Sequence, residues 1–171
     1  MKKVLIGFFT VCALVTVSVA QTDAGRLLPA VDVKGMDAKT FNTSKLSNNG
    51  KPMIISFWAT WCKPCKKELD AIAEHYEDWQ DETGVKLVAV STDDSRSSGK
   101  VSAEVKAKGW DYEVFLDENG DFKRAMNVND IPHTFLINGK GEIVWQHTSY
   151  ADGDEMHLYE ALKKVAKGEK P

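Results

Sequence analysis

Cys62 and Cys65, two cysteines separated by two residues, are the side chains in this chain best suited to chemistry. Disulfide exchange needs one accessible thiolate that attacks and a second thiol close enough to resolve the mixed disulfide. A helix that begins at such a pair meets both needs, because the unpaired N–H groups of its first turn favour a negative sulfur. We therefore expect Cys62 to be the nucleophile and Cys65, which points inward one turn later, to be the resolving thiol.

A purely structural disulfide is the alternative interpretation of this pair. It is disfavoured, because a bridge that closes so short a loop constrains the unfolded chain little. Pro64 between the cysteines is tolerated in a first helical turn, since its missing N–H would have no partner there. Lys63 either places a positive charge over the Cys62 sulfur, which would favour the thiolate, or extends into solvent. In solvent it would stabilise the thiolate little, because exposed ion pairs are weak.

Strand-like and helix-like segments alternate along the chain, which indicates an α/β sheet. A leading hairpin is expected from segments 28–33 and 39–46, and buried strands are expected at 53–58 and 85–90. Apolar residues after Pro64 recur at helical spacing as far as Gly84 and predict a helix there. The remaining predicted elements are a helix at 98–108, a strand at 112–116, a helical turn at 122–126, strands at 134–137 and 142–146 around an Asn-Gly turn, and a last helix with Leu158, Leu162 and Val165 on one side.

Residues 1–20 predict a cleavable secretory signal peptide, because basic Lys2 and Lys3 precede an apolar run that closes on small residues at Ala20. An uncleaved membrane anchor is the alternative, but the run is short for a bilayer span, which needs about 20 apolar residues. Residues 21–171 have a length that fits a single domain. Processing would also remove Cys12, and the remaining pair would lie in a periplasmic or other extracytoplasmic space, where disulfides persist.

The charge balance narrows the classes of partner. The chain has 22 basic and 25 acidic residues and a formal net charge of −3. A nucleic-acid-binding surface needs a basic patch that offsets phosphate, so nucleic-acid binding is disfavoured. Separately from the charge balance, we expect a monomer without a bound metal.

The segment from Phe57 to Glu68, Phe-Trp-Ala-Thr-Trp-Cys-Lys-Pro-Cys-Lys-Lys-Glu, resembles the active-site segment of thioredoxin-like thiol-disulfide oxidoreductases of the TlpA/ResA type. The resemblance in pattern covers about nine tenths of the chain that follows the signal peptide. It implies an α/β thioredoxin fold: a central mixed β-sheet flanked by helices, with an N-terminal β-hairpin and an inserted strand and helix before a cis-proline.

The same resemblance implies an activity. Proteins of this type mostly reduce disulfides in exported proteins, often in cytochrome c maturation or in the response to oxidants, and receive electrons from a membrane thiol carrier. No cofactor is implied besides the Cys62–Cys65 disulfide. The direction of electron flow is the open point, since a lower Cys62 pKa would stabilise the reduced pair and make it an oxidant.

Glu68 matches a position at which ResA-like proteins keep a buried acid near the cysteines. Thioredoxin itself has its acid on the preceding strand, where this chain has Ser56. Glu68 would then relay a proton to or from Cys65. The alternative is that Lys66, Lys67 and Glu68 form a solvated helix surface.

Ile131 and Pro132 match the cis-proline position of the family, where the residue before the proline offers backbone hydrogen bonds to an extended substrate segment. His133 departs from the small or hydroxylated residue expected next. Near Cys62 it would stabilise the thiolate as an imidazolium or bind a metal; the alternative is a histidine at a partly exposed strand end.

The substrate surface is expected to include aromatic and flanking residues. Trp58 and Trp61 are expected to shape the surface around the sulfurs and to contact substrate, whereas Trp79, Trp110 and Trp145 are expected to pack internally. The residues expected to bind substrate directly are Trp61, Lys63, Pro64, Ile131, Pro132 and His133.

Two other functions are conceivable for the cysteine pair. A metallochaperone would bind copper(I) or zinc through Cys62, Cys65 and His133, but copper-delivery relatives of the fold space their cysteines three residues apart, and no histidine-rich or methionine-rich tract is present. A peroxidase of the peroxiredoxin kind would carry Thr or Ser where this chain has Ala59, three residues before Cys62.

Overall fold

A computed structural model describes residues 25–171, so the predicted signal peptide, residues 1–20, lies outside the described residues. The described part contains one eight-stranded sheet with the order β1-β8-β7-β4-β5-β6-β2-β3. The strands are β1 (Arg26–Leu27), β2 (Asp32–Gly35), β3 (Thr40–Asn42), β4 (Met53–Trp58), β5 (Lys86–Ser91), β6 (Glu113–Leu116), β7 (His133–Ile137) and β8 (Glu142–Thr148). The helices are the 3-10 turn η1 (Thr43–Lys45), α1 (Lys63–Thr83), α2 (Gly99–Lys108), α3 (Asp121–Ala125) and α4 (Asp154–Ala166).

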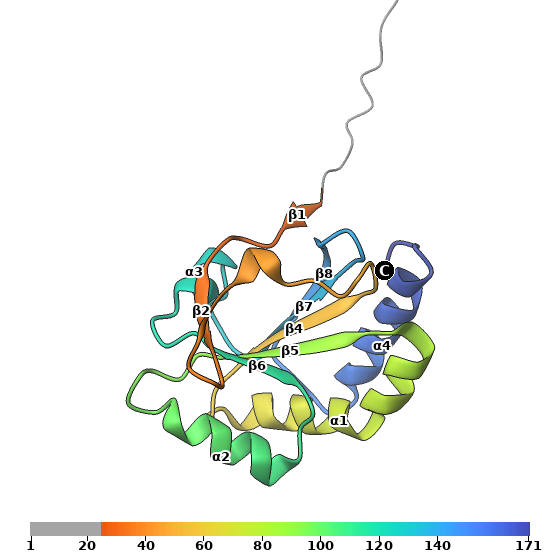
Figure 1. The fold of residues 1–171 in the computed structure, drawn as a ribbon. Helices are drawn as coiled ribbons and strands as arrows, with labels where there is room; N and C mark the ends of the chain where they lie inside the picture. The colour runs from red at the N-terminus through yellow and green to blue at the C-terminus, as the bar shows by residue number, and fades with distance from the viewer. Residues whose placement is uncertain (1–24) are drawn as a thin grey trace, which may run out of the picture.

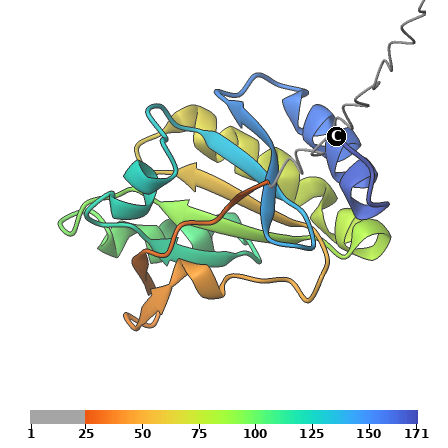
Figure 2. The same cartoon turned by 90° about the horizontal axis from the view of Figure 1, so that it is seen from above.

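The central strand β4 is parallel to β5 and antiparallel to β7, so the sheet is mixed. All of its residues are buried, as a continuous apolar run predicts for a strand covered on both faces. Figures 1 and 2 show α1 and α4 side by side on one face of the sheet. This is the thioredoxin fold that the resemblance to the TlpA/ResA type implies.

Two apolar clusters fill the two faces of the sheet. Successive strand residues point to opposite faces, so Ile54 and Trp58 of β4 pack with α1 and α4, while Ile55 and Phe57 pack beneath α3. On the α3 face, the ring of Phe57 lies 5.2 Å from that of Phe122, between ring centres. Each additional buried apolar side chain contributes about 1.5–3 kcal/mol, so the strand that precedes the cysteines is firmly fixed.

Most element bounds agree with the sequence pattern. Strand β4 has the predicted bounds, and α1 ends at Gly84, whose left-handed φ of 66° suits glycine. The insertion predicted before Pro132 is present as β6 and α3, and β2 pairs with β3 as the predicted hairpin.

The hairpin strands are shorter than predicted. The hydroxyl of Thr43 donates to the carbonyl oxygen of Pro29 at 2.6 Å and accepts from the Val31 N–H at 2.9 Å. Asn42 then caps η1, since its side chain accepts from the Ser44 N–H. These local side-chain bonds replace ladder pairing, so segment 28–31 is not a strand and 43–45 is a helical turn.

Among the helices of residues 25–171, none combines the length and the apolar composition needed to cross a membrane.

Candidate redox site

Cys62 caps the N-terminus of α1 and lies directly after β4. The Cys62 N–H donates to the Ala59 carbonyl at 3.0 Å, which closes a turn between the strand and the helix. The Cys62 sulfur in turn accepts from the Cys65 N–H at 3.3 Å. The positive end of a 21-residue helix therefore faces this sulfur, as predicted for a stabilised thiolate.

Cys62 and Cys65 are joined as a disulfide, with Cα atoms 5.4 Å apart. Cys65 is fully buried, whereas Cys62 is 5% exposed. The order of access is the predicted one, with Cys62 outside and Cys65 inside. Cys62 is nevertheless less exposed than expected for an attacking sulfur.

The peptide bond between Ile131 and Pro132 is cis. The Ile131 carbonyl oxygen lies 3.8 Å from the Cys62 sulfur. Ile131 is half-buried and Pro132 is buried, so the backbone of Ile131 is the part of this loop that a bound segment beside Cys62 would meet.

Glu68 is buried, with 4% of its surface exposed, so the alternative of a solvated helix surface is wrong for this residue. Its carboxyl group accepts hydrogen bonds from the hydroxyls of Thr134 at 2.8 Å and Ser56 at 3.1 Å. Burial is the main cause that raises the pKa of Glu68 to about 7; the hydrogen bonds from Thr134 and Ser56 oppose this rise, and the charge of nearby Asp154 adds to it. Glu68 lies three residues after Cys65, so the two side chains share one face of α1.

His133 is buried at the start of β7, so the expectation of a partly exposed strand end is wrong. Its ring stacks on Phe135 with 4.4 Å between ring centres, and its Nδ1 lies 3.2 Å from the Thr148 hydroxyl. Strand alternation places it on the sheet face opposite Thr134 and therefore opposite Glu68. Burial lowers the His133 pKa, which disfavours the imidazolium that thiolate stabilisation would require.

The two tryptophans before Cys62 differ completely in exposure. Trp61 is 69% exposed, and it lines a groove of 480 Å³ that extends to Lys123 and Arg124 of α3. Trp58 is fully buried and packs edge-on against Trp110, so the expectation that Trp58 contacts substrate is wrong. As the last residue of β4, Trp58 points into the core cluster under α1. Lys63 and Pro64, also expected at the substrate surface, are exposed.

Asp93 is a buried residue beside the site that sequence reasoning missed. It lies just after β5, is 1% exposed, and accepts hydrogen bonds from Thr60, two residues before Cys62. One signal was available: β4 and β5 were both predicted as buried strands, and polar residues just beyond the carboxyl ends of neighbouring parallel strands meet at one edge of a sheet.

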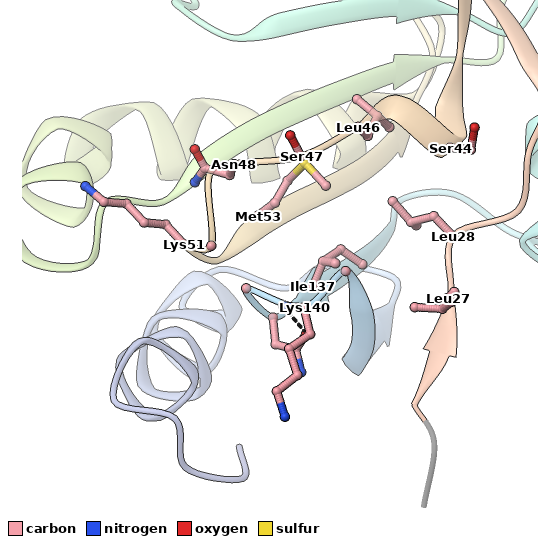
Figure 3. Close-up of a pocket in the computed structure, with 14 residues that line it drawn as sticks. Leu27, Leu28, Ser44, Leu46, Ser47, Asn48, Lys51, Met53, Ile137 and Lys140 are labelled. Carbon is pink, nitrogen blue, oxygen red and sulfur yellow. Dashed lines mark hydrogen bonds between the residues drawn. The ribbon is translucent and has the colours of Figure 1, made fainter.

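A second hollow, of 340 Å³, lies at the opposite end of β4 (Figure 3). Leu28, Leu46, Met53 and Ile137 line it, and Lys51 and Lys140 extend away from it in Figure 3. Its wall includes Gly139 of the β7–β8 turn, where an added Cβ would collide with the backbone of Gly50. The hollow carries none of the predicted site residues.

A Cys-x-x-Cys pair that begins the helix after the central strand, opposite a cis-proline loop, defines a thioredoxin-like protein. The chain belongs to the AhpC/TSA family, whose family model matches residues 24–146.

Curated relatives agree with this class. The thiol-disulfide oxidoreductase ResA of Bacillus subtilis (strain 168) is 36% identical over 115 residues, which cover 67% of this chain and 63% of the relative. Sporulation thiol-disulfide oxidoreductase A of the same strain is 36% identical over 99 residues, covering 57% and 59%. The matched part of the chain thus spans less than two thirds of the length of these two relatives.

Solved structures are also similar. A thioredoxin-like protein from Porphyromonas gingivalis is 55% identical, with a TM-score of 0.75 over 82% of this chain and 92% of that chain. StoA from Bacillus subtilis is 27% identical, with a TM-score of 0.61 over 78% and 98%.

Proposed function

We propose that this protein is an exported thiol-disulfide oxidoreductase that reduces disulfides in extracytoplasmic proteins through Cys62 and Cys65. The observation that carries the proposal is the placement of the two sulfurs: Cys62 caps α1 and receives the Cys65 N–H, and Cys65 lies fully buried behind it. The names of the curated relatives support the same chemistry.

The reaction starts from the reduced pair. The Cys62 thiolate attacks one sulfur of a substrate disulfide, forms a mixed disulfide and releases the other substrate sulfur as a thiolate. Cys65 then loses its proton and attacks the Cys62 sulfur. The mixed disulfide breaks, the second substrate thiolate leaves, and two electrons have passed from the protein to the substrate, leaving the Cys62–Cys65 disulfide.

Glu68 accepts the Cys65 proton in this scheme. A general base works best when its pKa lies near the working pH, and burial raises the pKa of Glu68 to about 7. Ser56 and Thr134 hold the carboxyl group in place from two adjacent strands.

Substrate binds as an extended segment across the Cys62 sulfur. The Ile131 backbone forms main-chain hydrogen bonds to it, and Trp61, Lys63 and Pro64 form the exposed surface that it contacts. In this proposal a membrane thiol electron carrier then reduces the oxidised Cys62–Cys65 pair, as the resemblance to the TlpA/ResA type implies.

An insulin-reduction assay tests the proposal. Every variant carries Cys12→Ala, so that Cys62 and Cys65 are the only cysteines that can react. The reduced protein should precipitate insulin. Cys65→Ser should accumulate a mixed disulfide, because the resolving thiol is absent, and Cys62→Ser should form none. Inert protein, or a mixed disulfide on Cys65, would refute the assignment.

A redox titration of the same protein tests the direction. A reductase should have a potential near that of thioredoxin, about −270 mV, and a value near −120 mV would identify an oxidant instead.

No observation favours the metallochaperone as a second candidate. Within residues 25–171, no three His, Cys, Asp or Glu side chains are grouped so that they could hold a metal ion. His133, the third ligand in that hypothesis, stacks on Phe135, on the sheet face away from α1.

A further inference from the structure

We propose that Asp93 is a positioning residue that holds the turn before Cys62 and thereby keeps the Cys62 sulfur at the N-terminus of α1. The proposal rests on the proposed function, because it concerns the reactivity of Cys62. Asp93 itself lies in the loop after β5 and carries out no chemistry.

The argument begins at the ends of two parallel strands. Trp58 and Ser91 are the last paired residues of β4 and β5. Beyond them the backbone ladder is extended by one bond, from the Thr92 N–H to the Trp58 carbonyl at 2.8 Å. The next residue, Asp93, therefore lies beside the turn that leads to Cys62.

The Asp93 carboxyl group holds Thr60 by two bonds. The Thr60 N–H donates to Oδ2 at 2.8 Å, and the Thr60 hydroxyl donates to Oδ1 at 2.6 Å. Two bonds to one residue fix its orientation as well as its position. Thr60 is the second residue of the turn that the Cys62 N–H closes on Ala59.

The carboxyl group is itself held rigidly. The Ser91 hydroxyl donates to Asp93 Oδ2 at 2.8 Å and accepts from the Asp93 N–H at 3.1 Å. Ser91 is fully buried and Asp93 is 1% exposed. No salt bridge joins Asp93 to a cation in the described part of the chain, so its partners are those of the loop and the strand end.

This arrangement explains why a buried acid is placed here. A buried carboxyl group is costly unless hydrogen bonds satisfy it, and here Thr60 and Ser91 supply those bonds. The donors come from the residues that set the path of the chain into Cys62. If the turn loosens, the Cys62 sulfur moves away from the helix N–H groups, and its thiolate loses their stabilisation.

The test compares Thr60→Val with Thr60→Ser in the full chain, again with Cys12→Ala. The pKa of the Cys62 thiol in the reduced protein is measured from the pH dependence of iodoacetamide alkylation. Thr60→Val removes the hydroxyl donor and should raise this pKa, slowing alkylation at neutral pH about fivefold. Thr60→Ser keeps the donor and should restore the wild-type value.

Thr83→Val is the matched control. Thr83 is a buried threonine whose hydroxyl donates to the Trp79 carbonyl at the other end of α1, whereas Thr60 is half-buried. The Thr83→Val substitution should lower the melting temperature without changing the Cys62 pKa. If Thr60 had only a structural role, Thr60→Val would likewise lower the melting temperature and leave the Cys62 pKa unchanged. Equal Cys62 pKa values in Thr60→Val and wild type would therefore overturn the proposal.

Asp93→Asn and the double variant complete the test. Thr60→Val and Asp93→Asn should each slow insulin reduction. The double variant should be no slower than the slower single variant, because both substitutions break the same contact between Thr60 and Asp93. Additive losses would overturn the proposal. If wild type alkylates at Cys62 but does not reduce insulin, the proposed function fails while the pKa comparison still decides the role of Asp93.

Discussion

The Thr134 hydroxyl donates to the Glu68 carboxyl group at 2.8 Å and so joins the helix that carries both cysteines to the strand that follows Pro132. Ser56 donates to the same group from the central strand. Because these partners are neutral hydroxyls, the carboxyl group gains hydrogen bonds without a compensating positive charge. Its pKa is therefore governed by burial.

Glu68 should make the fold less stable as pH rises. The unfolded chain ionises Glu68 near the ordinary glutamate pKa of 4.5, whereas the folded protein retains the proton until about pH 7. Stability from this group is complete below pH 4.5 and is lost between the two values, by up to roughly 3 kcal/mol. Urea unfolding of the oxidised protein should show this slope, and Glu68→Gln should remove it. An unchanged slope in Glu68→Gln would contradict the raised pKa.

Glu68→Gln should also slow the release of substrate. The wild-type rate of mixed-disulfide resolution should rise through about pH 7, where Glu68 loses its proton. Without the base this rise disappears, and resolution slows about 100-fold. Stopped-flow kinetics with a peptide disulfide measure the step. Glu74→Gln, an exposed position on the same helix, should leave the profile unchanged.

Trp61→Ala should weaken substrate binding with little effect on the fold. The Trp61 side chain is 69% exposed, so its removal should change the free energy of unfolding by less than about 0.5 kcal/mol. Loss of an aromatic contact should raise the KM for insulin about tenfold. Met156→Ala, which also removes an exposed apolar side chain, should leave KM unchanged. Equal KM values for Trp61→Ala and wild type would remove Trp61 from the substrate surface.

Gly139→Ala should destabilise the fold by about 1–3 kcal/mol, because the new methyl group would collide with the Gly50 backbone. Gly99→Ala is the control: nothing lies within 4 Å of the added carbon, and the first turn of α2 should become more stable. Urea unfolding compares the two. Similar stabilities would show that the β7–β8 turn and the Gly50 loop do not pack as described.

His133→Thr should leave the Cys62 thiol pKa unchanged while altering acid stability. Burial keeps the His133 pKa below 6.5 in the folded protein, whereas the unfolded chain binds a proton near 6.5. Wild type therefore loses stability as pH falls below about 6.5, and the variant lacks this component. Alkylation kinetics and acid unfolding measure the two quantities. A shift in the Cys62 pKa would restore the hypothesis of direct thiolate stabilisation.

Local patterns were enough to predict the frame of the site. The apolar run 53–58, the cysteine spacing and Gly84 mark a strand, a helix start and a helix end that depend mainly on neighbouring residues. The exposures of Trp58 and Trp61 could not be predicted in the same way. Both tryptophans lie close to the cysteine pair in the sequence. Trp58, the last residue of β4, is buried, whereas Trp61, in the turn that follows, is exposed.

Contacts between distant residues account for the rest. Whether Glu68 is solvated or buried depends on Thr134, 66 positions away, and on the packing of α1 against the sheet. Asp93 meets Thr60 across 33 positions. Neither contact leaves a periodic signal in the sequence, because each depends on which strands become neighbours.

The complete enclosure of Cys65 has a consequence for turnover. Any partner, whether it delivers electrons or takes them, has to form its covalent link at Cys62. A donor and an acceptor would therefore compete for the Cys62 sulfur, and only one of them could be covalently linked to the protein at a time. A kinetic scheme with two simultaneous mixed disulfides is incompatible with this geometry.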